Sequence, residues 1–194
     1  MLELLHCSLK DVLLERPRAL SEALIAYIAY EILTVLAFVH SAGLIHRDVC
    51  CDNVLLSSEG AVKLGDFGYA AQVTENRRKR TTVIGTPTYM APEVINGCRY
   101  DSKADIWSFG IVILEMAEGL MGAESPGMAL FTTASEPPPT LREPEKWSSA
   151  LADFLKCCLN KTPSQRSAAE DLHTHPFLQT KALPHTLAEF IVQE

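Results

Sequence analysis

The chain has 194 residues, of which 47% are hydrophobic and 21% are charged, and its formal net charge is −7. This composition predicts one ordinary globular domain with a sizeable core and excludes an intrinsically disordered chain. The acidic balance argues against broad nucleic-acid binding. It would suit a basic peptide partner, although a solvated, solubilising surface is the simpler explanation.

Six cysteines are spread along the chain, and none stands in a C-x-x-C pair, so a zinc site is not expected. No segment resembles a secretory signal peptide. Free thiols in a reducing compartment are the simplest interpretation, and they predict a cytoplasmic protein.

The first predicted elements are helices. A short helix is expected from Ser8 to about Glu15, after an extended start. Ser21 is a suitable N-cap for a long helix that runs to about Ser41, with Gly43 ending it. Its apolar stretch 23–39 is short for a membrane span and carries Glu31 near the middle, where an acid costs roughly 2.5–3.5 kcal/mol. We therefore expect a buried core helix and no membrane span.

Two β-rich segments follow, Val54–Leu56 and Ala61–Leu64, and the turn Ser57–Gly60 between them predicts a β hairpin. The polar, basic and irregular residues 74–92 predict a loop. The run 102–118 is almost wholly apolar after its first turn, which predicts a buried helix.

The last third of the chain is predicted to be helical after a loop at Pro137–Pro139. Two amphipathic helices are expected at 147–159 and 168–173, and a terminal helix at 187–192. The fold class is therefore α+β and mostly α-helical, with one small β hairpin.

Three motifs carry the chemistry. They are His46-Arg47-Asp48-Val49-Cys50-Cys51-Asp52-Asn53, then Asp66-Phe67-Gly68, then Gly85-Thr86-Pro87-Thr88-Tyr89-Met90-Ala91-Pro92-Glu93. In this order they resemble the H-R-D-x-x-x-x-N, D-F-G and A-P-E signatures of protein kinases. Each motif alone is weak evidence. All three, with a hairpin between the first two and a long loop before the third, form a highly specific signal.

The resemblance implies phosphoryl transfer from ATP, which depends on positioning and on cations held against developing negative charge. Asp48 would orient the substrate hydroxyl, and Thr86 would bond both Asp48 and the substrate backbone. Asn53 and Asp66 would supply oxygen ligands to Mg²⁺. Asp66 and Leu55 would also contact the nucleotide, with Leu55 in the apolar floor under adenine. His46 would be structural.

A closer resemblance, to the PAK family of serine/threonine kinases, covers essentially the whole chain through Phe177. It rests on the stretches Lys63–Gln72, Lys79–Pro87 and Asp105–Gly110, which are similar to the corresponding stretches of that family. The family's fold is implied for residues 1–178, as the C-terminal lobe of a protein kinase domain, and residues 179–194 are expected to form a C-terminal tail helix.

The PAK resemblance also implies roles for five further positions. Thr82 falls on the activating phosphothreonine, and Arg47 is the partner that would receive the phosphate. Glu93 and Arg166 match a buried ion pair that ties the activation segment to the lobe. Asp105 matches the helix aspartate that anchors the backbone of the catalytic loop.

The chain departs from the family at Cys50, where PAK-like kinases have a lysine that contacts the γ-phosphate. A thiol lacks that positive charge, so weaker catalysis is expected. Tyrosine kinases also lack the lysine, which makes a tyrosine kinase an alternative. Gly85-Thr86-Pro87 before Tyr89 is, however, the serine/threonine pattern.

The second departure is the missing N-lobe. A glycine-rich phosphate loop and a Val-Ala-Ile-Lys strand are not among these residues, and Met1 falls at about the hinge. This chain alone is therefore expected to show little or no kinase activity. A non-catalytic pseudokinase or interaction fragment is the alternative, and the intact Asp48, Asn53 and Asp66 argue against it.

The expected partners follow from the same resemblance. Asp52, four residues after Asp48, is expected to face the peptide and to favour a protein substrate that is basic around the target serine or threonine. The alternative is that Asp52 only caps the loop. A small GTPase would bind, if at all, through regions outside this chain.

Overall fold

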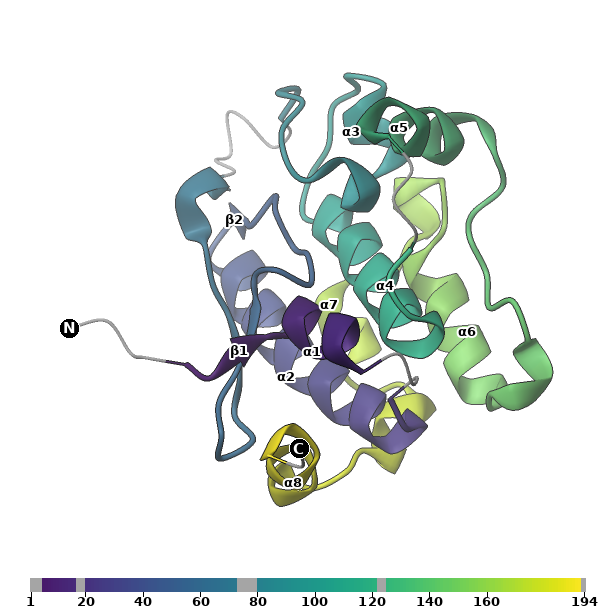
Figure 1. The fold of residues 1–194 in the computed structure, drawn as a ribbon. Coiled ribbons are helices and arrows are strands. Elements are labelled where there is room, and N and C mark those ends of the chain that lie inside the picture. Colours follow the sequence, from purple (N-terminus) through teal and green to yellow (C-terminus); the bar gives the residue numbers. More distant parts are fainter. Residues whose placement is uncertain (1–4, 17–19, 73–79, 122–124, 193–194) are drawn as a thin grey trace.

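The computed structural model of the chain describes residues 5–16, 20–72, 80–121 and 125–192. The α-helices are α1 (Leu9–Glu15), α2 (Glu22–Ser41), α3 (Pro92–Ile95), α4 (Lys103–Glu118), α5 (Pro126–Ser135), α6 (Ser149–Cys158), α7 (Ala169–Leu172) and α8 (Pro184–Val192). The strands are β1 (Cys7–Ser8), β2 (Leu44–Ile45), β3 (Val54–Leu56), β4 (Val62–Leu64) and β5 (Ala71–Gln72). The predicted, mostly helical α+β class is confirmed (Figure 1).

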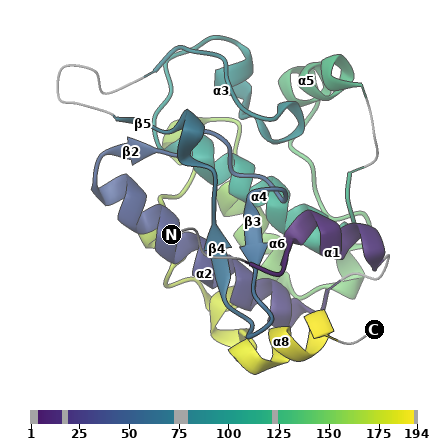
Figure 2. The same ribbon diagram turned by 60° about the vertical axis from the view of Figure 1, so that its left-hand side comes forward.

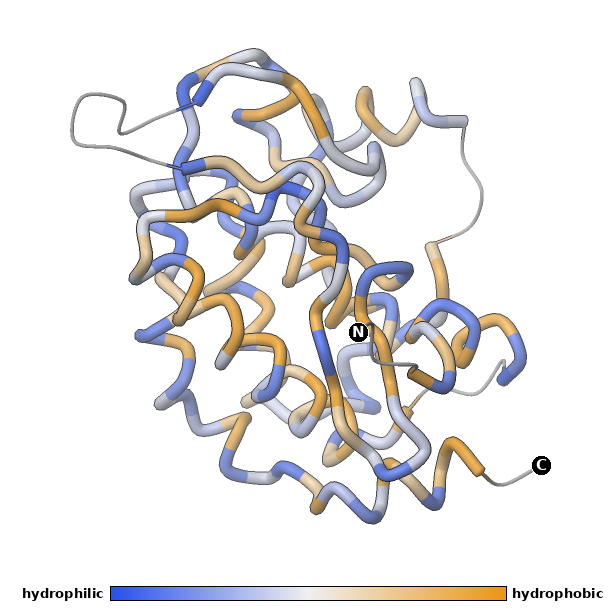
Figure 3. Tube along the Cα trace, turned by 90° about the vertical axis from the view of Figure 1, so that its left-hand side faces the viewer, coloured by the Kyte–Doolittle hydropathy of each residue, from blue (hydrophilic) through white to orange (hydrophobic). Residues whose placement is uncertain are grey.

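Helices α2 and α4 form the centre of the core. Helix α2 packs against α4, α7 and β4, and α4 also packs against α6. Nearly every residue of α4 is buried, including Trp107 and Phe109, as expected for a helix that is apolar all round. In Figure 3 these long helices carry much of the hydrophobic colour.

Helix α2 is long and apolar enough to cross a membrane by length and composition, but 56% of the tested window is buried inside the protein. Core packing therefore accounts for its apolar surface. The helix begins where predicted, because the Ser21 hydroxyl accepts a hydrogen bond from the Leu24 amide. The shorter α1 begins with a capping box between Ser8 and Asp11.

The predicted hairpin is confirmed and lies in a larger sheet. Strands β3 and β4 pair antiparallel, with Val54 opposite Leu64, and β1 adds a third strand beside β3 (Figure 2). A second small sheet pairs β2 with β5. Strands of two residues carry no detectable alternation, so the sequence could not indicate β2 or β5, whereas β1 lies in the extended start predicted before the first helix.

Helix α5 was not predicted, because no element was assigned between 119 and 136. The Ser125 hydroxyl accepts a hydrogen bond from the Met128 amide, and Pro126 occupies the first turn. Serine followed by proline is a typical helix start and was the available signal. Of the predicted loop 74–92, residues 74–79 lie outside the described part of the chain.

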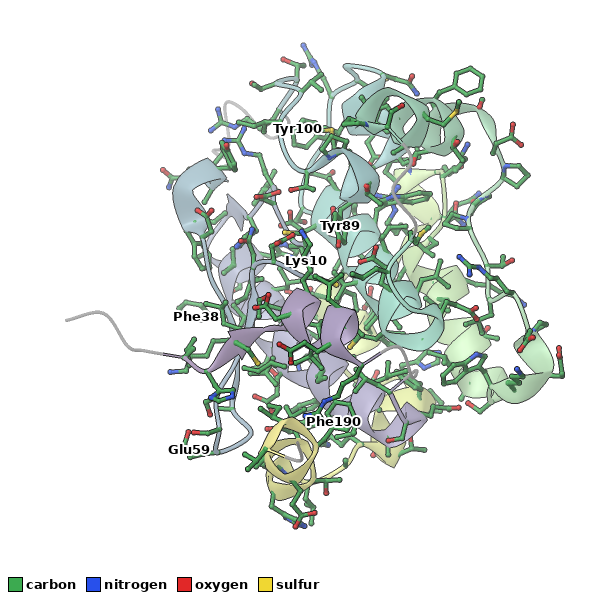
Figure 4. The ribbon with its side chains drawn as sticks, viewed as in Figure 1. Lys10, Phe38, Glu59, Tyr89, Tyr100 and Phe190 are labelled. Atoms are coloured by element: carbon green, nitrogen blue, oxygen red, sulfur yellow. The ribbon has the colours of Figure 1, made fainter. Side chains whose placement is uncertain are left out.

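The C-terminal helix α8 packs beside α1 and the hairpin turn. Arg16, which follows α1, donates to the carbonyls of Phe190 and Ile191, and its guanidinium lies 4.7 Å from the centre of the Phe190 ring (Figure 4). At the other end of α8, the Pro184 carbonyl touches Gly60 in the hairpin turn. A cation at a helix C-terminus stabilises the free carbonyls, so Arg16 helps to hold α8 in place.

The contact at Gly60 gives a first prediction. Gly60 has a φ of +84°, and a Cβ placed on it would lie 2.0 Å from the Pro184 carbonyl oxygen. Gly97 has a φ of +63° and nothing within 4 Å of such a Cβ. Gly97→Ala should therefore cost about 1–2 kcal/mol of unfolding free energy from backbone strain alone. Gly60→Ala should cost at least about 1 kcal/mol more, because the clash adds to the strain.

Urea denaturation of both variants measures the two costs. Gly127 has no positive φ, open space around it and a place in the first turn of α5, so the control Gly127→Ala should leave stability unchanged or raise it by up to about 1 kcal/mol. Equal costs at positions 60 and 97 would show that α8 does not press on the hairpin turn.

Candidate functional site

The carboxylate of Asp105, in the first turn of α4, anchors the loop 46–53 through hydrogen bonds to its backbone. Its Oδ2 accepts the backbone N–H of His46 and its Oδ1 accepts that of Arg47, both at 2.8 Å. The Nε2 atom of His40, at the end of α2, lies 2.8 Å from Oδ2. The Asp105 side chain is 1% exposed, so these partners replace the water that it has lost.

The backbone of Arg47 has a φ of +72°, which is uncommon for a residue with a side chain. Such a conformation persists only where the surroundings impose it, and here Asp105 binds both adjacent amides. The positive φ lies immediately before Asp48. The anchored turn therefore sets the direction in which Asp48 leaves the loop.

The structure brings Asp48, Thr86 and Asn53 together. Asp48 Oδ1 accepts hydrogen bonds from the Thr86 amide at 2.9 Å and from the Thr86 hydroxyl at 2.8 Å. The Asn53 amide nitrogen donates to Asp48 Oδ2 at 3.1 Å and to the Asp48 carbonyl at 2.8 Å. Because the side-chain nitrogen of Asn53 donates to Asp48, the side-chain oxygen Oδ1 is the atom that can bind another partner.

Gly85 allows its segment of the chain to approach the loop 46–53 this closely. Its φ is +123°, and a Cβ at this position would lie 2.6 Å from the carbonyl oxygen of Arg47. No side chain fits there without moving backbone. The glycine therefore has a physical role, which is to let Thr86 reach Asp48.

Asp66 lies next to Asn53, because the Gly65 amide donates to the Asn53 carbonyl at 2.8 Å. Asp66 itself has a φ of +54°, and its Oδ1 accepts the Gly68 amide. A Cβ added to Gly65 would lie 3.1 Å from Leu55 Cδ1, so half-buried Leu55 borders the same place. The carboxylate of Asp66 is exposed, and carboxylate and amide oxygens are ligands that suit a hard cation such as Mg²⁺.

His46 supports this region, as expected for a structural residue. Its Nε2 lies 2.9 Å from the Gly65 carbonyl oxygen, and its ring meets the Phe67 ring edge-on at 4.6 Å between centroids. These contacts tie the loop 46–53 to the segment that carries Asp66.

Glu115 is a residue of this site that sequence reasoning missed. It is 2% exposed on α4, and its Oε2 accepts the Tyr89 hydroxyl at 2.6 Å and the Cys51 thiol at 3.2 Å. Its Oε1 accepts the Met121 amide. Burial raises the pKa of Tyr89 and of Cys51, so both remain protonated donors. The available signal was an acid within an apolar helix.

Glu93 and Arg166 form a bidentate ion pair. The Arg166 nitrogens lie 2.7 and 3.0 Å from the two carboxylate oxygens, and both side chains are buried. Arg166 also lies over the Trp107 ring at 5.3 Å. The pair joins α3 to the C-terminal part of the core.

Thr82 and Arg47 are not joined by a hydrogen bond within the residues that the structure describes. The Nε atom of Arg47 donates to the Tyr69 carbonyl, and Thr82 is exposed, with its carbonyl accepting the Tyr100 hydroxyl at 2.8 Å. The exposed hydroxyl of Thr82 is open to modification, whereas its pairing with Arg47 stays a prediction.

Cys50 and Asp52 occupy different surroundings in the same loop. Cys50 is 1% exposed, and burial raises the pKa of its thiol to about 11, so the thiol is neutral near pH 7. The exposed carboxylate of Asp52 pairs with Lys10 of α1, at 2.9 Å between Nζ and Oδ1. The role of Asp52 toward a peptide stays a prediction, and Lys10 is not among the site residues that the sequence predicts.

A separate group of possible metal ligands consists of Asp153, Cys157 and His175. The Phe177 amide donates to His175 Nδ1, which places the proton of the neutral ring on Nε2, beside Asp153. Histidine ligands usually donate from their second nitrogen. A metal on Nε2 of His175 would leave Nδ1 as the second nitrogen, and Nδ1 accepts a hydrogen bond instead of donating one. We therefore assign no metal to the group.

Comparisons with known proteins identify the family of the chain. Residues 1–178 match the family described as protein kinase domain. The chain is 47% identical over 180 residues to the serine/threonine-protein kinase pakB of Dictyostelium discoideum, covering 90% of this chain and 21% of pakB. It is 45% identical over 174 residues to the serine/threonine-protein kinase cst-1 of Caenorhabditis elegans, covering 89% of this chain and 35% of cst-1.

A third relative is the serine/threonine-protein kinase 4 homolog A of Dictyostelium discoideum. The identity is 44% over 196 residues, which cover 97% of this chain and 42% of that protein. The chain thus spans less than half the length of each of these curated relatives.

The anchor at Asp105 gives a second prediction. Asp105→Asn should lower the unfolding free energy by about 2–4 kcal/mol, because an amide presents one donor where Asp105 now accepts backbone N–H groups. Asp153, whose side chain is 67% exposed and pairs with His175, is the control, and Asp153→Asn should change stability by less than about 1 kcal/mol. Chemical denaturation measures both. Similar costs for the two variants would contradict the role of Asp105 as a buried anchor.

Cys50 gives a third prediction. With a pKa of about 11, only about one thiol in a thousand is ionised at pH 8, and the side chain is buried. Iodoacetamide at pH 8 should therefore modify exposed Cys98 well before Cys50, as followed by peptide mass spectrometry. In urea the two should react at similar rates. Equal labelling of both cysteines in the native protein would show that Cys50 is not held as a buried thiol.

Proposed function

Since the chain belongs to the protein kinase domain family, we propose that it carries the phosphate-transfer site of a PAK-like serine/threonine protein kinase, which moves the γ-phosphate of ATP to a protein hydroxyl. The observation that carries the proposal is the arrangement around Asp48, which Thr86 and Asn53 hold while the Asp66 segment is hydrogen-bonded to Asn53.

The residues of the chain have separate tasks in the proposed reaction. Asp48 accepts the hydrogen bond of the substrate hydroxyl, and its orientation is maintained by Thr86 and Asn53. Asn53 Oδ1 and the Asp66 carboxylate hold the divalent cation that the kinase family uses with ATP. When bound, ATP supplies the transferable phosphoryl group and Mg²⁺ neutralises the charge that develops on it. Leu55 contributes apolar surface to the nucleotide site.

Thr86 supports a serine or threonine target over tyrosine. Its hydroxyl and amide both bind Asp48, which brings the segment that would meet the substrate backbone against the catalytic loop. The alternative of a non-catalytic module is less well supported, because Asp48, Asn53 and Asp66 are all present and close together. The neutral thiol of Cys50 does not supply the charge of the family's lysine, and we propose that it slows the reaction.

Regulation and partners are proposed from the same resemblance. Phosphorylation of exposed Thr82 would provide an anion for Arg47, and the pairing would order the activation segment. Protein substrates follow from the family, and exposed Asp52 is proposed to favour basic residues near the target hydroxyl. We further propose a cytoplasmic location, and small-GTPase binding only through regions outside these residues.

The proposed activity can be tested by phosphate transfer from γ-labelled ATP. The family's glycine-rich loop and its lysine are not among these 194 residues, so the assay compares the chain alone with a fusion in which the small lobe of pakB precedes residue 1. The chain alone should be inactive. The fusion should phosphorylate serine or threonine peptides in a Mg²⁺-dependent manner, and Asp48→Asn should slow this by about 10²–10⁴-fold.

Incorporation of phosphate at tyrosine would favour the tyrosine-kinase alternative. A folded fusion that binds ATP and transfers no phosphate would favour the non-catalytic module.

A further inference from the structure

Lys10 and Asp52 form an ion pair across 42 positions of the sequence. Lys10 Nζ lies 2.9 Å from Oδ1 and 3.0 Å from Oδ2 of Asp52, so both carboxylate oxygens are engaged. The side chains are 42% and 49% exposed, which leaves the pair open to an incoming peptide. Figure 4 shows the position of Lys10 on α1.

The backbone places these two side chains together. The Lys10 amide donates to the Cys51 carbonyl at 3.1 Å, directly before Asp52, and strand β1 pairs Ser8 with Leu55. Asp11, the neighbouring acid on α1, is occupied by the Ser8 amide and hydroxyl in the capping box. The first turn of α1 is thus docked on the catalytic loop, with Lys10 directed to Asp52.

The charge of the loop makes this contact important. From Asp48 to Asn53 the sequence contains two carboxylates and no basic residue. Cys50 is a neutral thiol at neutral pH. Lys10, on α1, therefore brings a positive charge to the loop, where it pairs with the exposed carboxylate of Asp52.

We propose that Lys10 is a specificity-determining residue, which competes with basic side chains of the substrate for Asp52 and so weakens the preference for basic peptides. The inference rests on the proposed function, in which Asp52 faces the peptide. An arginine of the substrate must displace the Lys10 ammonium before it can pair with Asp52. The chain therefore discriminates less between basic and neutral peptides than Asp52 alone would allow.

The test measures peptide binding to the 194-residue chain by fluorescence anisotropy. Two labelled serine peptides differ only in carrying arginine or alanine two and three residues before the serine, and the ratio of their Kd values is the readout. Lys10→Gln should increase the preference for the arginine peptide by about two- to five-fold, the range expected for an exposed ion pair. Asp52→Asn should remove the preference, and Lys10→Gln should add nothing in that background.

Lys146→Gln is the matched control, because Lys146 also pairs with an exposed acid, Glu143, and the substitution changes the net charge equally. It should leave the ratio unchanged. An equal effect of both lysine variants would assign the preference to long-range charge and overturn the proposal. An unchanged ratio in Lys10→Gln would overturn it as well, as would failure of the wild-type chain to bind either peptide.

Phosphate transfer by the pakB fusion is measured separately. Absence of transfer, with the binding ratio still altered by Lys10→Gln, would contradict the proposed function and leave the role of Lys10 intact. Phosphate transfer, with a binding ratio that Lys10→Gln leaves unchanged, would support the proposed function and contradict the role of Lys10.

Discussion

The buried carboxylate of Asp105 is the contact on which the geometry of the site depends. It joins the first turn of α4 to two consecutive amides of the loop 46–53 and to His40 at the end of α2. Burying a carboxylate is costly unless hydrogen bonds replace water, and all three partners serve that purpose. The left-handed backbone at Arg47 is maintained by this anchor, so the position of Asp48 follows from the packing of the two central helices.

Two further buried acids extend this arrangement to the activation segment. Glu115 binds the side chains of Tyr89 and Cys51, and Glu93 binds Arg166. Each joins segments that are distant in the sequence, and each has its oxygens satisfied by defined donors. Buried polar networks of this kind are stabilising only when they are complete. The close approach of Gly85 to the Arg47 carbonyl requires the same precision from the backbone.

The exposed edge of the loop 46–53 is organised differently. Asp48 is held by neutral donors, Cys50 is an uncharged buried thiol, and Asp52 is paired with a lysine from α1. Exposed ion pairs contribute little to stability, because water competes for both partners. Lys10 and Asp52 therefore form a contact that a substrate can exchange, in contrast to the buried acids beneath it.

The sequence by itself determined the family, the motifs around Asp48 and Asp66, and the long helices with their serine caps, because these signals are local periodicities and fixed spacings. Helix α5 also has a local signal, Ser125 followed by Pro126. The tertiary structure decided which donors each carboxylate receives. The packing of α4 brings Glu115 to Tyr89 and Cys51. The packing of α1 against the loop brings Lys10 to Asp52, 42 positions away in the sequence. Contacts of this kind depend on how elements pack in space, and no local pattern of residues records that packing.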